Sequence, residues 1–425
     1  MTPPARLAAV IDLLAAIEAA PRRPADAVAH SFFRERRYIG GGDRRDISDQ
    51  VWFALRHWRR LEWWLQRGEG HATARLLPAA AAILSGRPVE SLQRAYSGGR
   101  YAPDPLQPAE LRVLRALEGH TIEHPEMPDA VRHEVPDWLL PLLAERFGPE
   151  LEAELAAMTG QAPLDLRVNL LKGTREQAAR ALAEAGIETE PMTLSPWGLR
   201  ARGRQNVTAA AAFRDGLVEI QDEGSQLVVA ALQAAPEMRV ADYCAGAGGK
   251  TLAIAMSMGN RGHIVACDVS EPRLDGAVRR LRRAGVHNVE RHLLVAGDKW
   301  AKRRAASFDC VLVDAPCTGT GTWRRNPDAR LRLRRRDLEE LVEKQATILR
   351  DAARLLRPGG RLVYATCSVL PQENEAQIAR FLAVQPGFVQ VPALLGRDVI
   401  SLTPRRDGTD GFFAAALTTG PNHAG

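Results

Sequence analysis

Apolar residues recur every three or four positions through the first part of the chain, which predicts helices. One such stripe contains Leu7, Val10, Ile11, Leu14 and Ile17. A cluster of proline and glycine over residues 97–108 indicates a loop. We therefore expect an all-helical domain over residues 1–145. We interpret its four tryptophans between positions 52 and 64 as packing residues rather than as a platform for stacking bases.

A different pattern follows, in which strand-like and helix-like segments are short. Residues 164–170 alternate between apolar and polar side chains, as a half-buried strand does. Thr174 and Gln177 have the spacing of a capping box, so a helix should begin there and end before Gly186. Extended pieces are expected at residues 189–194 and 198–202. Residues 146–215 are therefore predicted to form a small α+β module.

From residue 216 onward, apolar strand-like runs alternate with helical stretches. The predicted strands are residues 239–243, 263–268, 289–295, 308–314 and 361–366, with a late strand at 412–417. The predicted helices include residues 271–284 and 337–356. Such alternation is typical of a parallel, doubly wound sheet with helices on both faces. The fold class predicted for residues 216–425 is therefore α/β.

Basic residues exceed acidic ones by 57 to 51 over 425 residues, and part of the surplus is clustered. Seven arginines and a single acid, Asp328, lie between Arg324 and Arg336. This run has two interpretations. It is either a solvated helix face or a surface that contacts the phosphates of a nucleic acid.

The five cysteines show no CxxC pair, so no metal site is expected. Their odd number does not suggest a disulfide framework and fits a reducing, cytoplasmic location. Asp12 and Glu18 interrupt the apolar stretch near the N-terminus, so neither a signal peptide nor a membrane span is expected. We expect a monomer with no membrane partner.

A glycine-rich loop follows the first predicted strand of the α/β region, at residues 242–251. A Walker A loop would need glycine where Cys244 stands, so ATP or GTP binding fails on the spacing. A nucleoside cofactor bound in the Rossmann manner needs an acid at the end of the second strand, and Asp268 is there. The alternative role for Asp268 is to cap the next helix. The loop residues expected to bind the cofactor are Cys244, Ala245, Gly246, Ala247, Gly248, Gly249 and Lys250.

Further carboxylates and two cysteines follow the later strands. Asp298 lies after the third strand and Asp314 ends the fourth, so both should line the same crevice as Asp268. Asp298 is otherwise a plain loop acid. Cys317 follows the fourth strand and Cys367 the fifth, which favours chemistry over the usual role of cysteine as a small buried hydrophobe. Cys267 and Cys310 lie inside strands and are interpreted as core.

The order of these motifs resembles that of the Nop2/Sun (NOL1/NOP2/Sun, RsmB-like) family of RNA 5-methylcytosine methyltransferases. The stretches that carry the resemblance are residues 221–226, the loop at 242–251, Asp268, 314–321, 324–328, 364–368 and 371–375. The first 145 residues also resemble, more weakly, the NusB-like RNA-binding domain of the bacterial small-subunit rRNA branch. The family's loop usually has Ala-Pro where this chain has Gly246-Ala247. The resemblance implies a Rossmann-like class I methyltransferase sheet that binds S-adenosyl-L-methionine.

The resemblance also implies the chemistry. Cytosine C5 becomes nucleophilic only when a thiolate adds to C6, and the family assigns that covalent role to the residue that is Cys367 here. Asp314 would contact the N3 and amino edge of the base, and Lys250 is a candidate helper. Cys317 would assist release, and the base must be unpaired or flipped to reach the pocket.

Small-subunit rRNA is the expected substrate and tRNA the alternative. Three other functions compete with this prediction. A DNA cytosine-5 methyltransferase would use Cys317 as its nucleophile. A catalytically retired assembly factor would bind RNA without needing the four intact site residues, Asp268, Asp314, Cys317 and Cys367. A small-molecule methyltransferase would not need the helical domain or the arginine run.

Overall fold

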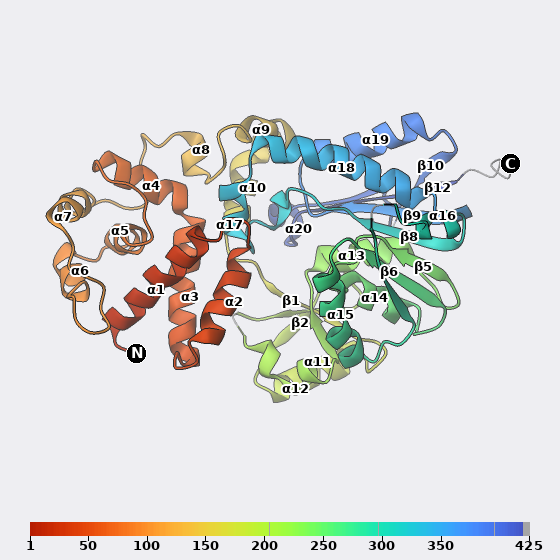
Figure 1. Ribbon diagram of the computed structural model, residues 1–425, viewed down its shortest axis with the longest axis horizontal. Helices are drawn as coiled ribbons and strands as arrows, with labels where there is room; N and C mark the ends of the chain where they lie inside the picture. The colour runs from red at the N-terminus through yellow and green to blue at the C-terminus, as the bar shows by residue number, and fades with distance from the viewer. Residues whose placement is uncertain (204, 296, 395, 420–425) are drawn as a thin grey trace. The chain divides into compact units, whose positions relative to one another are not determined.

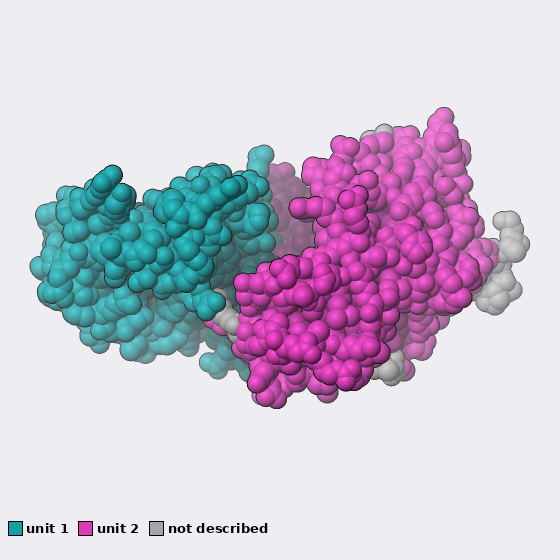
Figure 2. Space-filling model, turned by 90° about the horizontal axis from the view of Figure 1, so that it is seen from below, with its two compact units in different colours: residues 1–160, 323–335 teal, residues 161–322, 336–425 magenta. Residues whose placement is uncertain are grey.

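The computed structural model describes residues 1–203, 205–295, 297–394 and 396–419. The chain divides into two compact units (Figure 1 and Figure 2). The helical unit consists of residues 1–160 and 323–335, and the sheet unit consists of residues 161–322 and 336–425. Within the described ranges, no helix is both long and apolar enough to cross a bilayer. The division into three domains at residues 145 and 215 stays a prediction.

The helical unit is built from short helices, as the apolar spacing predicts. They are α1 (Pro3–Glu18), α2 (Ala25–Glu35), α3 (Gly41–Arg56), α4 (Trp58–Arg67), α5 (Leu76–Leu84), α6 (Val89–Ala95), α7 (Pro108–Arg115), α8 (Asp129–Arg132), α9 (Leu140–Phe147), α10 (Leu151–Thr159) and α17 (Pro327–Arg332). Helix α1 shows why they form. Thr2 caps its first turn, and Leu7, Val10 and Leu14 of the predicted stripe are buried.

Part of the arginine run is buried, which neither interpretation of the sequence predicted. Residues 323–335 pack within the helical unit, and Arg330 is only 1% exposed. Its guanidinium donates to the hydroxyl of Thr159 and to the carbonyl of Arg56. Asp328 accepts a hydrogen bond from the backbone N–H of Ala25 (3.1 Å). Part of the run therefore holds this unit together, and only its later members, such as Arg336, are exposed.

The sheet unit contains a small antiparallel sheet with the strand order β2-β3-β1-β4. Its elements are β1 (Leu164–Val168), α11 (Arg175–Glu184), β2 (Thr189–Pro191), β3 (Gly198–Ala201), α12 (Ala211–Arg214) and β4 (Val218–Ile220). Helix α11 begins with the predicted capping box, in which Thr174 and Gln177 bond each other's backbone N–H groups. Leu166, Ala178 and Leu182 are among the residues that form the core between this sheet and its helices.

The large sheet has the strand order β10-β12-β9-β8-β5-β6-β7, with β11 paired to β12. Its strands are β5 (Arg239–Asp242), β6 (His263–Asp268), β7 (Val289–Leu293), β8 (Phe308–Asp314), β9 (Leu356–Thr366), β10 (Phe388–Val391), β11 (Val399–Leu402) and β12 (Phe412–Thr419). Strands β5 to β9 pair in parallel, and β12 runs antiparallel to β9. The Rossmann-like α/β prediction is confirmed.

Helices cover both faces of this sheet. The helices that follow the small sheet are α13 (Glu223–Leu232), α14 (Gly249–Ser257), α15 (Glu271–Ala284), α16 (Trp300–Arg303), α18 (Arg335–Ala353), α19 (Glu375–Val384) and α20 (Pro404–Asp407). Because side chains alternate along a strand, Cys310 and Leu312 of β8 pack with α13, α14 and α15. Val311 and Val313 pack with α16, α18 and α19 on the other face. Cys267 and Cys310 are buried core residues, as expected.

The predicted boundary between helix α18 and the next strand was wrong. The helix expected over residues 337–356 spans Arg335–Ala353, and the strand expected from residue 361 begins at Leu356, so Gly359 and Gly360 lie inside β9. An added Cβ at Gly360 would lie 2.8 Å from the carbonyl oxygen of Asp309 on β8. Gly360 therefore allows close strand approach, whereas Gly359 has a positive φ of 73° and open space around it.

Candidate active site

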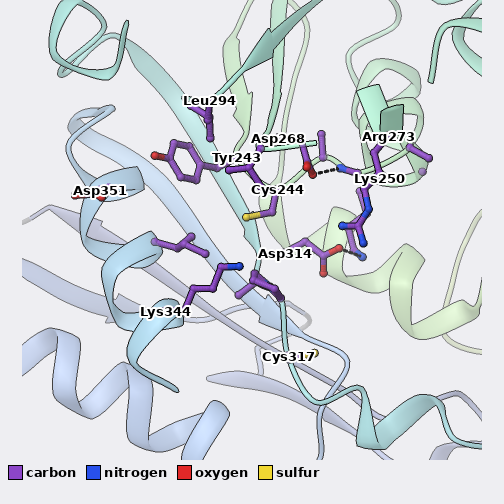
Figure 3. Close-up of a pocket in the computed structure, with 18 of the residues that line it drawn as sticks. Tyr243, Cys244, Lys250, Asp268, Arg273, Leu294, Asp314, Cys317, Lys344 and Asp351 are labelled. Atoms are coloured by element: carbon purple, nitrogen blue, oxygen red, sulfur yellow. Dashed lines mark hydrogen bonds and ion pairs between the residues drawn. The ribbon is translucent and has the colours of Figure 1, made fainter. Parts of the chain in front are cut away.

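Strand β5 lies inside the large sheet, with β6 and β7 on one side of it and β8 and β9 on the other, so the strand order reverses direction at β5. Ligands of such sheets bind outside the carboxyl ends of the strands at this switch point. A cavity of about 1400 Å³ opens there (Figure 3). The predicted site residues that line it are Cys244, Ala245, Gly246, Ala247, Gly249, Lys250, Asp268, Asp298, Asp314, Cys317 and Cys367.

Gly248 is the one predicted cofactor residue that the structure does not bring to the cavity lining. Its φ is 78°, and an added Cβ would lie 3.0 Å from the Cβ of Ala277 on α15. Glycine at this position therefore permits close packing between the loop and a helix. The neighbouring Gly246, which departs from the family's usual residue, also has a positive φ of 55°, but open space surrounds it.

Buried polar contacts hold the glycine-rich loop between β5 and α14. Thr251, in the first turn of α14, donates a hydrogen bond to the carboxylate of Asp242 (2.7 Å). Asp242 is fully buried, and this burial raises its pKa to about 7. The backbone N–H of Gly246 donates to Oδ2 of Asp268 (2.9 Å), which joins the loop to the end of β6.

Asp268 and Asp298 both reach the cavity, but protein groups already contact their oxygens. Oδ1 of Asp268 accepts from the N–H of Ser270 (2.9 Å), so this residue also supports the start of α15. Asp298 accepts from the N–H of Trp300 (2.7 Å), and this hydrogen bond lowers its pKa. Its other oxygen lies 2.6 Å from the His292 ring, which stacks on Trp300. These contacts fix the direction of both carboxylates at the cavity edge.

An ion pair lies at the centre of the site. The ammonium of Lys250 is 2.6 Å from Oδ2 of Asp314 (Figure 3). Burial alone would lower the pKa of Lys250, but the contact with Asp314 outweighs it, and the pKa is raised. Lys250 therefore remains charged and directs a donor toward Asp314.

The two candidate cysteines meet in the same cavity, although 50 residues separate them in the chain. The Sγ atoms of Cys317 and Cys367 are 3.4 Å apart. The hydrogen bond with Cys367, together with burial, raises the pKa of Cys317 well above its ordinary value. Within the pair, Cys317 therefore keeps its proton and can donate it toward the Cys367 sulfur. Burial also raises the pKa of the Cys244 thiol in the cofactor loop.

A buried network behind the cysteines positions both of their loops. The carboxylate of Glu373 accepts hydrogen bonds from the N–H of Thr318 (2.8 Å) and from the side chain of Gln345 on α18 (2.9 Å). Asn374 donates to the carbonyl of Ser368 (2.9 Å) and accepts from the hydroxyl of Thr366 (2.6 Å). Glu373 and Asn374 thus hold the residues that flank Cys317 and Cys367. Sequence analysis noted their motif but gave it no role.

Helix α18 also contributes residues that sequence analysis missed. Lys344 and Asp351 line the cavity from this helix, and Arg354 lines it from the residue just after the helix; Figure 3 labels the first two. Together with Ile348, these residues are spaced three or four positions apart along the chain, as residues on one face of a helix are. That periodicity was the available signal, but it does not show which way the face points.

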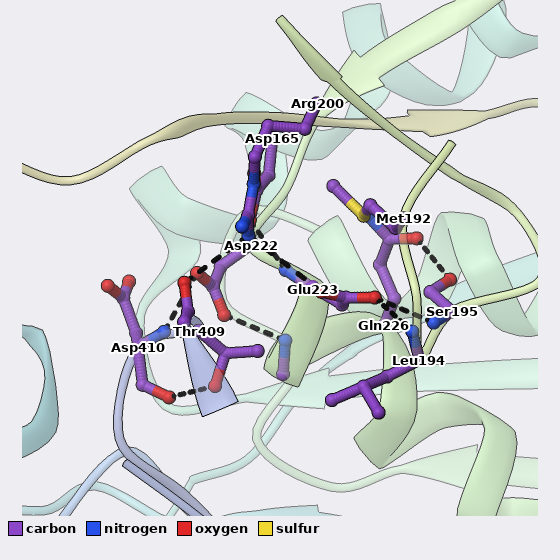
Figure 4. A network of polar contacts seen from close by, with 12 residues as sticks. Asp165, Met192, Leu194, Ser195, Arg200, Asp222, Glu223, Gln226, Thr409 and Asp410 are labelled. Atoms are coloured by element: carbon purple, nitrogen blue, oxygen red, sulfur yellow. Dashed lines mark hydrogen bonds and ion pairs between the residues drawn. The ribbon is translucent and has the colours of Figure 1, made fainter. Parts of the chain in front are cut away.

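The segment at residues 221–226 joins the small sheet to the site (Figure 4). Asp165 of β1 accepts from Arg200 and from the N–H of Glu223 (3.2 Å). The Glu223 carboxylate accepts from the backbone N–H groups of residues 194 and 195, and Asp222 accepts from the N–H of Asp410. Arg167 of β1, also buried, donates to the carbonyl of Gly249 in the cofactor loop (3.0 Å). The small sheet is therefore fastened directly to the cofactor loop.

The chain is similar to known RNA methyltransferases. The family described as 16S rRNA methyltransferase RsmB/F matches residues 229–418, and the RsmF/B-like ferredoxin-like domain matches residues 135–208. Ribosomal RNA small subunit methyltransferase B of Photorhabdus laumondii is 34% identical in an alignment of 317 positions. The alignment covers 72% of this chain and 72% of that protein. The crystal structure of PH0851 covers 99% of both chains with a TM-score of 0.83 and 26% identity. The structure of NSun6 from Pyrococcus horikoshii with SFG covers 67% of this chain and 98% of that one, with a TM-score of 0.61 and 21% identity.

Proposed function

Because this chain belongs to the RsmB/F family of Nop2/Sun RNA methyltransferases, we propose that it methylates carbon 5 of a cytosine in small-subunit rRNA. The observation that carries the proposal is the meeting of Cys317 and Cys367, with sulfurs 3.4 Å apart, in one cavity with the Lys250–Asp314 ion pair. Two thiols and a charged pair at one site suit covalent attack on a base followed by release.

S-adenosyl-L-methionine is the methyl donor of this family, and the cavity fits such a molecule. The cavity volume of about 1400 Å³ exceeds what one nucleoside cofactor needs, which leaves room for a base. Open space above Gly246 lets a ligand approach the loop backbone, while Asp268 and Asp298 offer fixed carboxylates at the edge. When bound, the cofactor supplies a methyl group on a positively charged sulfur.

The remaining chemistry comes from the chain's own side chains. The Cys367 thiolate would add to C6 of the cytosine, which makes C5 electron-rich. The proton that Cys317 shares with the Cys367 sulfur stabilises that thiolate before attack. Asp314, held by Lys250, would bond the N3 and amino edge of the ring, where charge changes during addition. After methylation, Cys317 would assist the elimination in which the C5 proton passes to water, the C5–C6 double bond re-forms and the C6–S bond to Cys367 breaks.

The test compares wild type with Cys367→Ser and Cys317→Ser, using S-adenosyl-L-methionine and small-subunit rRNA. We expect Cys367→Ser to be inactive and to form no adduct, and Cys317→Ser to accumulate a protein–RNA adduct that survives denaturing gels and is seen by intact mass. If Cys367→Ser still methylates while Cys317→Ser does not, the nucleophile is Cys317 instead. A parallel reaction with tRNA decides between the two RNA classes.

A further inference from the structure

The helical unit contains a second pocket, of about 500 Å³, formed by α4, the segment after α8, and the end of the α17 segment. Two half-buried tryptophans, Trp58 and Trp138, lie in its wall together with the buried Arg330. The exposed Arg334 and Arg335 lie at its edge. We call it the Trp58–Trp138 pocket. Its volume is within the range of pockets that hold small ligands, which begins at roughly 300 Å³.

Two carboxylates of the pocket are bonded within the helical unit, whereas the buried Arg330 makes no direct ion pair among the described residues. Glu134 is fully buried and accepts from the backbone N–H groups at the start of α4 and from the Arg60 side chain. Nη2 of Arg59 donates to both carboxylate oxygens of Asp137 (3.1 Å each). Over the described residues, in contrast, no carboxylate oxygen lies within 4 Å of the Arg330 guanidinium, whose contacts are a hydroxyl and a carbonyl. Glu134 acts on the Arg330 charge through space, so an anionic ligand would supply the direct ion pair that Arg330 lacks.

The aromatic residues add a second kind of recognition. The guanidinium of Arg335 lies 5.8 Å from the centroid of the Trp138 ring. The Trp138 indole N–H is buried, and within the described part of the chain it donates to no acceptor. The third carboxylate of the pocket, Glu62, is half-buried and offers an acceptor of the kind that the amino groups of bases bond. Aromatic rings, arginines and one acceptor together suit a base with its phosphate.

We propose that the Trp58–Trp138 pocket binds one unpaired nucleotide of the RNA substrate, its base against the tryptophans and its phosphate at Arg334 and Arg335. The inference rests on the proposed function for the presence of RNA, but it concerns a different unit of the chain from the catalytic cavity. The arginine run thus serves twice, since its middle part supports the helical unit and its end faces the ligand.

The experiment measures binding of the full chain to a fluorescein-labelled single-stranded RNA of about 12 nucleotides by anisotropy. Trp138→Ala should weaken binding by about 5- to 100-fold, the usual effect of losing one stacked base, whereas Trp138→Phe keeps a ring and should bind within about threefold of wild type. Arg335→Ala should lower the slope of log affinity against log salt by about 0.7, the value for one lost phosphate contact. Thermal melts check that each variant is folded.

Arg94→Ala is the matched control, because Arg94 is exposed on α6 of the same unit and does not line the pocket. It should leave RNA affinity unchanged. The proposal is overturned if folded Trp138→Ala and Arg335→Ala bind RNA like wild type. If these variants keep RNA binding and lose only the binding of an acidic peptide, the pocket is a peptide site and the proposal is also overturned. Absence of methyl transfer by wild type would count against the proposed function alone, since the anisotropy comparison does not depend on catalysis.

Discussion

Replacing Glu373 by alanine should loosen the loops that carry both cysteines. Its carboxylate accepts from the N–H and hydroxyl of Thr318 and from the side chain of Gln345. After the replacement, the Thr318 hydroxyl can turn toward Ser368, 3.3 Å away. The Thr318 N–H and the N–H of the Gln345 amide that faced Glu373 are then left without an acceptor, while the other N–H of that amide keeps the carbonyl of Pro316 (2.9 Å). Each costs about 1–3 kcal/mol, so the free energy of unfolding should fall by about 2–6 kcal/mol.

The assay is thermal unfolding followed by methyl transfer to RNA. At roughly 2–4 °C per kcal/mol for a unit of this size, Glu373→Ala should lower Tm by about 5–20 °C. Because the loop beside Cys317 then shifts, the rate of methyl transfer should drop by roughly 10- to 100-fold even well below the new Tm. Glu373→Gln keeps the shape and one acceptor oxygen, so both losses should be smaller.

Glu343→Gln on α18 is the control, because Glu343 is an exposed carboxylate paired with Arg380 at the surface. Such a pair contributes about 0–1 kcal/mol, so Tm should hardly move. The reasoning about Glu373 is refuted if Glu373→Ala melts within about 2 °C of wild type, or if it loses stability but methylates at the wild-type rate.

Three further predictions follow from the site. Gly248→Ala should destabilise the chain and weaken binding of S-adenosyl-L-methionine in calorimetry, because the new methyl group meets α15. Gly259→Ala, also at positive φ but in open space, should cost only about 1–2 kcal/mol, and equal effects would contradict the packing argument. Burial raises the pKa of Asp242 to about 7, so this carboxyl stays protonated in the folded chain where the unfolded chain would ionise it. Its favourable contribution to the free energy of unfolding is therefore present at pH 4 and is lost as the pH rises through 7. Wild type should therefore lose stability over that range in thermal melts, whereas Asp242→Asn should show a flatter curve, and parallel curves would refute the assignment. Hydrogen peroxide should join Cys317 and Cys367 in a disulfide, the two thiol hydrogens leaving in water, with reversible loss of activity. Intact mass checks this, and an unchanged mass would show that the sulfurs cannot close from 3.4 Å.

The sequence predicts the sheet well because its strands are buried on both faces and therefore read as apolar runs. Residues 263–268 and 308–314 have the same bounds in the structure as in the prediction. The glycine loop and the acids at the strand ends were located for the same reason, since parallel strands bring their carboxyl ends to one edge.

What the sequence could not predict depends on contacts between distant segments. Nothing in the local pattern of Glu373 shows that its carboxylate reaches Thr318, 55 residues earlier. The interpretation of the four tryptophans as packing residues is confirmed most fully for Trp64, which is buried, but it gave no sign that Trp58 lines a pocket with Trp138. Likewise, charge density alone could not separate the buried Arg330 from the exposed Arg335, because only packing within the helical unit distinguishes them.

The two parts of the helical unit, residues 1–160 and 323–335, are separated by a long stretch of chain, and this separation has a consequence for biosynthesis. Residues 1–160 leave the ribosome first, but Asp328 and Arg330, which bond Ala25 and Arg56, are made only after a further stretch of chain up to residue 335. At about 5–20 residues per second, that stretch takes roughly 10–35 s to translate. During this interval the nascent N-terminal helices lack part of their packing. Their final packing must therefore wait until four of the eight strands of the large sheet, β5 to β8, have been synthesised.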